Sequence, residues 1–228
     1  MTNTHKIVVK VEIETLFNGN GQLSLEKMDH LAMVCANLQN SGLQVMIVSS
    51  GAIVLGTAKL GFERQPRGIV QKQAVAAVGQ AELMRLYQLC FDGFDQMVAQ
   101  VLLTQDAITN PVRNRNAMAT FAKLLEKGVI PVINENDSVS TDDIIENDNY
   151  PLTLIVANIT RADAIIVKTK REGMYQLIFK DNSHVYRITE EMLYNLKDWI
   201  EGGSYRADEG FYGFPDQIDE DKVESLSI

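Results

Sequence analysis

The sequence predicts an α/β fold, a sandwich in which a mostly parallel central sheet is covered by helices on both faces. Short apolar, β-branched runs alternate with helical stretches over most of the 228 residues. These runs are apolar at consecutive positions, which is typical of strands buried on both faces of a parallel sheet. No linker, repeat or low-complexity stretch interrupts the pattern before residue 180. We therefore expect a single domain over 1–228, with its core in 1–180.

The first half of the chain gives two strands and two helices in alternation. Residues 7–11 are β-branched at every position except Lys10 and predict a buried strand. Ser24 is a suitable N-cap for a helix that ends near Gly42, because glycine suits the residue after a helix. Residues 45–48 predict the next strand, and residues 71–91, rich in Ala, Leu, Met and Gln, predict a long helix.

The second half continues the alternation and then loses it. We expect strands at 98–104, 129–133 and 164–167, separated by helices at 114–127 and 152–159. Beyond residue 180 the pattern weakens to one strand and one amphipathic helix within residues 184–203. The remaining stretch is polar and acidic and contains no confident core strand.

The charge balance excludes one class of partner. The chain carries 21 Lys and Arg against 30 Asp and Glu, a net charge of −9. A general nucleic-acid binder needs a basic face, so we expect no nucleic-acid partner. A phosphorylated small molecule stays possible because it needs only local positive charge. The excess is concentrated in residues 181–228, which contain 12 acidic and 4 basic side chains.

The sequence shows no sign of a membrane or of an oxidising compartment. It has no signal-peptide pattern, and no apolar run approaches the roughly 20 residues that span a bilayer. Cys35 and Cys90 lie in apolar helical runs, as buried free thiols do. We expect a cytoplasmic protein with no membrane partner. The spacing of His and Cys residues suggests no metal site.

Two polar segments follow predicted strands, where ligands bind in open α/β sheets. Ser50, Gly51 and Ala52 could present hydroxyl and backbone N–H groups to an anion, or could form only a turn and helix cap. The polar run of Asn134, Glu135, Asn136 and Asp137 could bind an amine and hydroxyls, or could form an Asx turn. The same two interpretations apply to the Asn147–Asn149 run. Neither GxGxxG after the first strand nor a P-loop motif is present.

Lys10 is the most unusual single residue, because it interrupts the apolar run of the first strand. Lysine is rarely buried unless it is paired. We weigh a charge-binding role against a side chain that reaches solvent from the edge of the sheet.

These segments, in this order and spacing, resemble the glutamate 5-kinase family of the amino-acid kinase superfamily. The resemblance covers roughly residues 6–180 and is carried by KIVVKV, VSSGAI, KQAVAAVGQAELM, AQVLLT, GVIPVINEND and EGMY. It implies a three-layer α/β/α sandwich, the amino-acid kinase fold. It also implies transfer of the ATP γ-phosphate to L-glutamate with Mg²⁺, on the way to proline, and a homo-oligomer.

The resemblance implies an intact substrate side. The residues expected to line a glutamate pocket are Ser50, Gly51, Ala52, Asn134, Asp137, Asp148 and Asn149. Hydroxyl and backbone donors suit a carboxylate, and the Asp137 carboxylate suits an α-ammonium group.

The phosphate side departs from the family pattern at four positions. Lys10, the first catalytic lysine that the resemblance implies, is present, but Glu12 replaces a glycine of the phosphate loop. Like charges at 4 Å cost about 4 kcal/mol at an effective dielectric of 20, so Glu12 should repel ATP. The organising aspartate is replaced by Tyr150, and a nucleotide-side aspartate by Lys170. The best placement of the second lysine falls on Gln217, after which the chain soon ends, so we expect a shortened C-terminal part.

Three hypotheses follow for the function. The first is a glutamate 5-kinase homologue that keeps a pocket for glutamate or a similar acidic amino acid but has lost most or all kinase activity. The second is an active, divergent kinase that needs ATP and Mg²⁺ and uses Lys170 or Arg171 near the phosphates. The third is a non-catalytic regulatory or structural subunit that associates with another protein.

Overall fold

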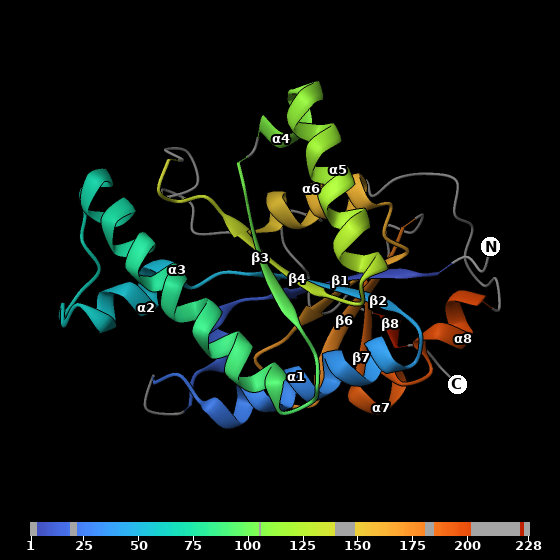
Figure 1. Ribbon diagram of the computed structural model, residues 1–228. Coiled ribbons are helices and arrows are strands. Elements are labelled where there is room, and N and C mark those ends of the chain that lie inside the picture. The colour runs from blue at the N-terminus through green and yellow to red at the C-terminus, as the bar shows by residue number, and fades with distance from the viewer. Residues whose placement is uncertain are drawn as a thin grey trace.

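The computed structural model describes residues 4–18, 22–104, 106–139, 149–180, 185–201 and 224–225. Within them an eight-stranded sheet has the strand order β3-β4-β2-β1-β5-β6-β7-β8 (Figure 1). The strands are β1 (Lys6–Val11), β2 (Gln44–Ser49), β3 (Val98–Leu103), β4 (Ile130–Glu135), β5 (Ala164–Lys168), β6 (Met174–Phe179), β7 (Tyr186–Thr189) and β8 (Glu224–Ser225).

The sheet is mostly parallel, as the sequence predicts. The first five strands in that order pair in parallel, while β6 is antiparallel to both of its neighbours. Strand β1 lies in the middle of the parallel part, where Lys10 stands opposite Val48 of β2 and Val167 of β5. A residue of β1 therefore has a strand on either side, and Lys10 is not at the edge of the sheet.

Helices cover both faces and give the expected three layers. The face with α1, α3, α7 and α8 and the face with α5 and α6 each bury a separate apolar cluster against the sheet (Figure 1). The helices are α1 (Leu25–Asn40), α2 (Ala52–Lys59), α3 (Ile69–Asp92), α4 (Asp106–Thr109), α5 (Pro111–Glu126), α6 (Tyr150–Thr160), α7 (Glu190–Leu193) and α8 (Leu196–Glu201), and a 3-10 turn, η1 (Ile13–Leu16), follows β1.

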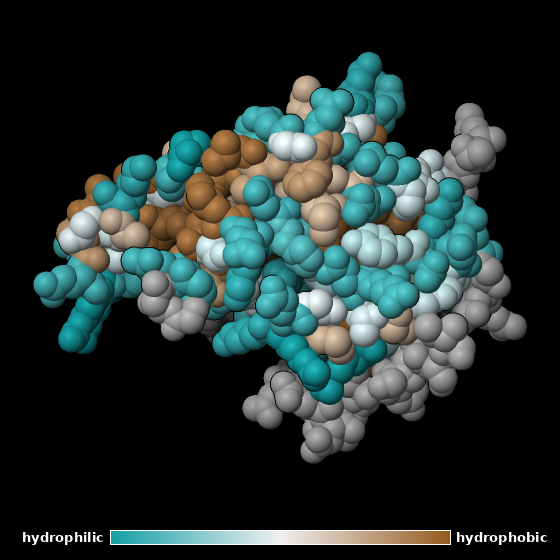
Figure 2. All heavy atoms as spheres, turned by 90° about the horizontal axis from the view of Figure 1, so that it is seen from below, coloured by the Kyte–Doolittle hydropathy of each residue, from teal (hydrophilic) through white to brown (hydrophobic). Residues whose placement is uncertain are grey.

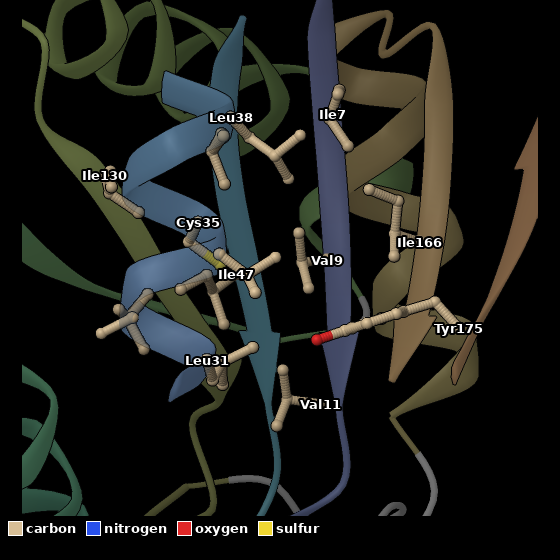
Figure 3. Close-up of a cluster of buried hydrophobic side chains, with 14 of the residues drawn as sticks. Ile7, Val9, Val11, Leu31, Cys35, Leu38, Ile47, Ile130, Ile166 and Tyr175 are labelled. Carbon is tan, nitrogen blue, oxygen red and sulfur yellow. The ribbon is translucent and has the colours of Figure 1, made fainter. Parts of the chain in front are cut away.

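In the first apolar cluster, the buried side chains of α1 recur at helical spacing and pack on the strands β1 and β2. In Figure 3, Leu31, Cys35 and Leu38 of α1 lie against Val9 of β1 and Ile47 of β2. The helix residues recur at the spacing of one helical face, and the two strand residues point to the same side of the sheet. All five are at most 2% exposed, which confirms the predicted burial of the Cys35 thiol. Cys90 is likewise buried and free.

Several elements differ from the sequence prediction at their ends. Helix α5 begins at Pro111 rather than near residue 114, because the Asn110 side chain accepts the backbone N–H groups of Val112 and Arg113. The helix expected after residue 184 is divided into α7 and α8. Strand β6 is additional: Gly173, at φ +67°, turns the chain back so that β6 pairs with β5. Residues 224–225, which were not expected to form a strand, pair with β7.

Helices α2 and α3 cross in direct backbone contact. A Cβ atom on Gly56 would lie 2.0 Å from the carbonyl oxygen of Val75, and one on Gly79 would lie 1.7 Å from that of Ala52. Only glycine fits at these two positions. The contact holds the first turn of α2 in place at the carboxyl end of β2.

Among the helices that the structure describes, none is long and apolar enough to cross a lipid bilayer.

Candidate functional site

The segment after β2 forms a tight turn that leads into α2. Gly51 has φ +117°, and a Cβ atom there would lie 2.6 Å from the Cβ of Ile13. The Ser50 hydroxyl accepts the backbone N–H of Ile13 at 3.2 Å, which joins this turn to the segment after β1. No N-cap side chain accepts from the first turn of α2. The segment therefore is a structural turn, as one interpretation held, and it also leaves helix N–H groups available to an anion.

Strand β4 ends in a buried amide network. The Asn134 side chain donates to Gln80 Oε1 at 2.9 Å and accepts from Asn149 Nδ2 at 3.1 Å. It also accepts the backbone N–H of Glu135 at 2.9 Å. Asn149 precedes α6 without capping it through its side chain. The Asx-turn interpretation therefore fails for Asn149, whose amide instead links α6 to β4 and, through Asn134, to α3.

These segments enclose one hollow, with an empty volume of about 490 Å³ that includes space open to solvent. It contains both backbone donors at the start of α2 and acidic side chains around the end of β4. The lining residues are Ile13, Glu14, Ser50, Gly51, Ala52, Ile53, Val54, Asn134, Glu135, Asp137 and Asn149. Six residues that the sequence assigned to substrate binding are thus brought together: Ser50, Gly51, Ala52, Asn134, Asp137 and Asn149.

Lys10 is fully buried near the end of β1 and does not itself line this hollow. Its ammonium nitrogen is 2.5 Å from Glu12 Oε1 and 3.4 Å from the centroid of the Tyr150 ring. The negative charge of Glu12 and the face of the Tyr150 ring both stabilise the ammonium group, which would otherwise be costly to bury. The interpretation of Lys10 as an edge residue that reaches solvent is therefore wrong.

The other expected phosphate-side residues lie less close together. Tyr150 begins α6 and covers Lys10. Lys170 is exposed in the turn between β5 and β6 and does not line the hollow. Asp148 and Gln217 lie outside the described residues, so their predicted roles stay predictions.

Sequence reasoning missed several residues of the site. Gln80 holds Asn134 from α3, and Ile13 forms the wall opposite Gly51. Glu135, which belongs to the polar run expected to bind an amine and hydroxyls, also lines the hollow and is only 3% exposed. Nothing in the sequence identifies Gln80, which lies in an ordinary helical stretch.

A second buried lysine lies on the opposite face of the sheet. Lys168 ends β5, is 7% exposed and has its nitrogen 5.3 Å from the Tyr175 ring centroid. Burial lowers the pKa of Lys168, and the nearby Lys27 lowers it further, while Glu190 and Glu172 raise it. Burial also raises the pKa of the Cys35 thiol to about 12. Neither group lines the hollow.

No cluster of three or more His, Cys, Asp or Glu side chains in the described part of the chain is arranged to hold a metal ion.

Comparison with known proteins places the chain in a family. Residues 6–211 match the model of the amino acid kinase family. Glutamate 5-kinase of Listeria innocua serovar 6a is 42% identical over 179 residues, which are 77% of this chain and 65% of that protein. Glutamate 5-kinase of Clostridium perfringens (strain 13 / Type A) is 41% identical over 202 residues, which are 84% of this chain and 75% of that protein.

The chain thus spans just under two thirds of the length of the Listeria relative. Among solved structures, UMP kinase from Bacillus anthracis (BA1797) superposes with a TM-score of 0.46 at 17% identity, over 74% of this chain and 66% of that one. The family model spans most of the sheet and helices described above, and the Clostridium relative is covered over three quarters of its length. The chain therefore belongs to the amino acid kinase family.

Proposed function

We propose that this chain is a glutamate 5-kinase homologue that binds L-glutamate or a similar small acidic amino acid in the hollow at the carboxyl ends of β2 and β4. We further propose that it has lost most or all of the ATP-dependent transfer to the side-chain carboxylate. The observation that carries the first part is the amide network of Gln80, Asn134 and Asn149, which fixes the wall of the hollow.

The hollow offers complementary groups to both ends of an amino acid. The N–H groups at the start of α2 and the Ser50 hydroxyl are donors for a carboxylate. Asp137 and Glu135 are acceptors for an ammonium group. A ligand that carries both charges gains on both sides, whereas a dicarboxylate without an amine would place its own negative charge near the acidic side chains and donate no ammonium hydrogen bond to them.

The phosphate side does not fit MgATP in this arrangement. The Lys10 ammonium group is already engaged by the Glu12 carboxylate and the Tyr150 ring. Phosphoryl transfer depends on cations that neutralise the moving phosphate. We therefore derive no step through ATP or Mg²⁺.

A second candidate, an active but divergent kinase, is favoured by one observation. Lys170 is exposed in the turn that follows β5, the strand next to β1, and could supply positive charge at that edge of the sheet. Turnover that Lys170→Ala removes would support this candidate over the first.

The proposal also covers the domain organisation, the location and the partners of the chain. We propose one domain, a cytoplasmic location, no nucleic-acid or membrane partner and self-association into a homo-oligomer. Figure 2 shows apolar side chains gathered on one part of a largely hydrophilic face, toward the end of the molecule that holds α2 and α3. Exposed apolar residues on these helices and the loop between them include Phe62, at 52%, and Val70, at 77%. Sedimentation velocity of Val70→Lys, which should shift the protein toward monomer, tests the association.

Calorimetry with L-glutamate tests the binding function. Saturable binding is expected, weakened at least ~10-fold by Asp137→Asn, because the substitution removes one charge and leaves the shape unchanged. Asp95→Asn, the same change at an exposed loop residue away from the hollow, is the matched control and should leave binding unchanged. 2-Oxoglutarate, which lacks the amine, should bind more weakly than glutamate. Equal binding by wild type and Asp137→Asn would refute this assignment of the pocket.

A turnover measurement tests the second part of the proposal. With MgATP and glutamate, no glutamyl phosphate should form above background. Formation that Lys10→Ala abolishes would refute the loss of activity while leaving the glutamate pocket intact.

A further inference from the structure

The buried ammonium group of Lys10, in β1, has no role in the glutamate pocket proposed above. Lys10 is fully buried in a central strand, and a buried ammonium group needs a counter-charge to offset its lost hydration. In open α/β sheets the carboxyl end of a central strand is where ligands bind, so an external anion could supply that charge.

This chain supplies a counter-charge of its own. Glu12 follows Lys10 by two residues and places Oε1 2.5 Å from the ammonium nitrogen. The Glu12 side chain is itself 41% exposed, so the carboxylate reaches the lysine from the solvent side of the pair. It can leave without any rearrangement of the apolar core. The Tyr150 ring lies over the lysine at 3.4 Å.

The ion pair adjoins the proposed pocket through the chain. Glu12 immediately precedes Ile13 and Glu14, and Tyr150 immediately follows Asn149. Ile13, Glu14 and Asn149 all line the hollow. Glu12 thus contacts the buried cation and is joined directly to residues that line the hollow.

We propose that Glu12 is an internal anion that occupies Lys10 in place of a phosphate, and that its withdrawal turns Lys10 into a binding site for phosphate-type anions. This deepens the proposed function by naming the contact that closes the phosphate side, and it rests on that function for the identity of the pocket.

Inorganic pyrophosphate is the probe, and Glu12→Gln is the perturbation. The substitution keeps the size of the side chain and removes the charge, so the buried lysine loses the carboxylate it now contacts. Glu12→Gln should therefore melt at a lower temperature than wild type, and pyrophosphate should raise its melting temperature by ~5 °C as it replaces the lost charge. Wild type should respond by less than ~1 °C at the same concentration. Calorimetry should show at least ~10-fold tighter pyrophosphate binding to the variant.

Three further variants make the test specific. Glu26→Gln removes the same charge from the exposed first turn of α1 and should respond like wild type. The double variant Glu12→Gln with Lys10→Met should not respond, because the cation is gone. Glu12→Gly removes the whole side chain, so it tests the proposal independently of any misfolding of Glu12→Gln and should also gain pyrophosphate binding.

The outcomes separate this inference from the proposed function. If neither Glu12 variant gains pyrophosphate binding, or if the gain persists without Lys10, Glu12 is not an internal anion for Lys10 and the proposal is overturned. Glutamate calorimetry on wild type is read separately: its failure removes the pocket assignment, while a gain at Lys10 on loss of Glu12 still supports the internal anion.

Discussion

Gly79→Ala separates local helix propensity from packing, because helix propensity predicts a more stable protein and packing predicts a less stable one. Gly79 lies inside the 24-residue helix α3. By propensity alone, alanine in a helix interior is better than glycine by about 0.8–1 kcal/mol. In this fold, however, the new Cβ would lie 1.7 Å from the carbonyl oxygen of Ala52 and 2.5 Å from the backbone nitrogen of Gly56.

The cost of the steric overlap is larger than the gain in helix propensity, so the net change in stability should be negative. Real Cβ atoms essentially never approach other heavy atoms within 3.0 Å, so the two backbones must separate by at least ~1 Å. Overpacking of this kind costs about 1–3 kcal/mol or more, and contact with backbone on both sides favours the upper end. After the gain in propensity, we expect a net loss of about 2 kcal/mol. For a chain of this size that corresponds to a fall of about 4–8 °C in melting temperature.

The separation of α2 from α3 should also disturb the glutamate pocket. Ala52 is the first residue of α2 and lines the hollow, so glutamate binding should weaken together with stability. The assay is thermal unfolding followed by circular dichroism, with calorimetry of glutamate on the folded variant. Gly93→Ala is the matched control: it lies at the end of α3 with helical φ, its nearest neighbour is the Cys90 carbonyl oxygen at 3.4 Å, and it should change stability by less than about 0.5 kcal/mol. If Gly79→Ala melts at or above the wild-type temperature, the close crossing of α2 and α3 is wrong.

Three further predictions concern titratable groups. Burial lowers the pKa of Lys168, so the charged lysine destabilises the folded state at neutral pH. This destabilisation disappears as the pH rises toward 10.5, the ordinary pKa of a lysine. Lys168→Met should therefore raise the melting temperature at pH 7, and by a smaller amount in alkaline solution. Arg85 and Lys59 lower the pKa of Glu82 to about 2, so the advantage of wild type over Glu82→Gln, under about 1 kcal/mol, should be present above pH 4.5 and lost as pH falls toward 2. Burial raises the pKa of the Cys35 and Cys90 thiols to about 12, so a disulfide reagent at pH 8 should react with neither until the protein unfolds; rapid reaction with the native protein would contradict their burial.

The strands and long helices were predictable because their signals are local. Apolar β-branched runs and helical spacing marked β1, β2 and α1, and the side chain of Ser24 does cap the helix that follows it. The polar groups after β2 and β4 were predictable as a site because parallel strands bring their carboxyl ends to one edge.

The remaining features depend on contacts between distant segments. Nothing local distinguishes Gly79 in α3 from a poor helix residue, since its role is set by Ala52 in another helix. The hydrogen bond from Asn134 to Gln80 joins residues 54 positions apart. Glu12 was expected to repel phosphate, but its ion pair with Lys10 depends on side-chain directions that the sequence does not specify.

Thermal unfolding of the wild-type protein with L-glutamate and with MgATP, each added separately, tests both the glutamate pocket and the closed phosphate side. The pocket at the carboxyl ends of β2 and β4 predicts a rise in melting temperature with glutamate, and the engaged Lys10 predicts none with MgATP. Stabilisation by MgATP in the absence of glutamate would contradict the closed phosphate side, and no stabilisation by glutamate would contradict the pocket.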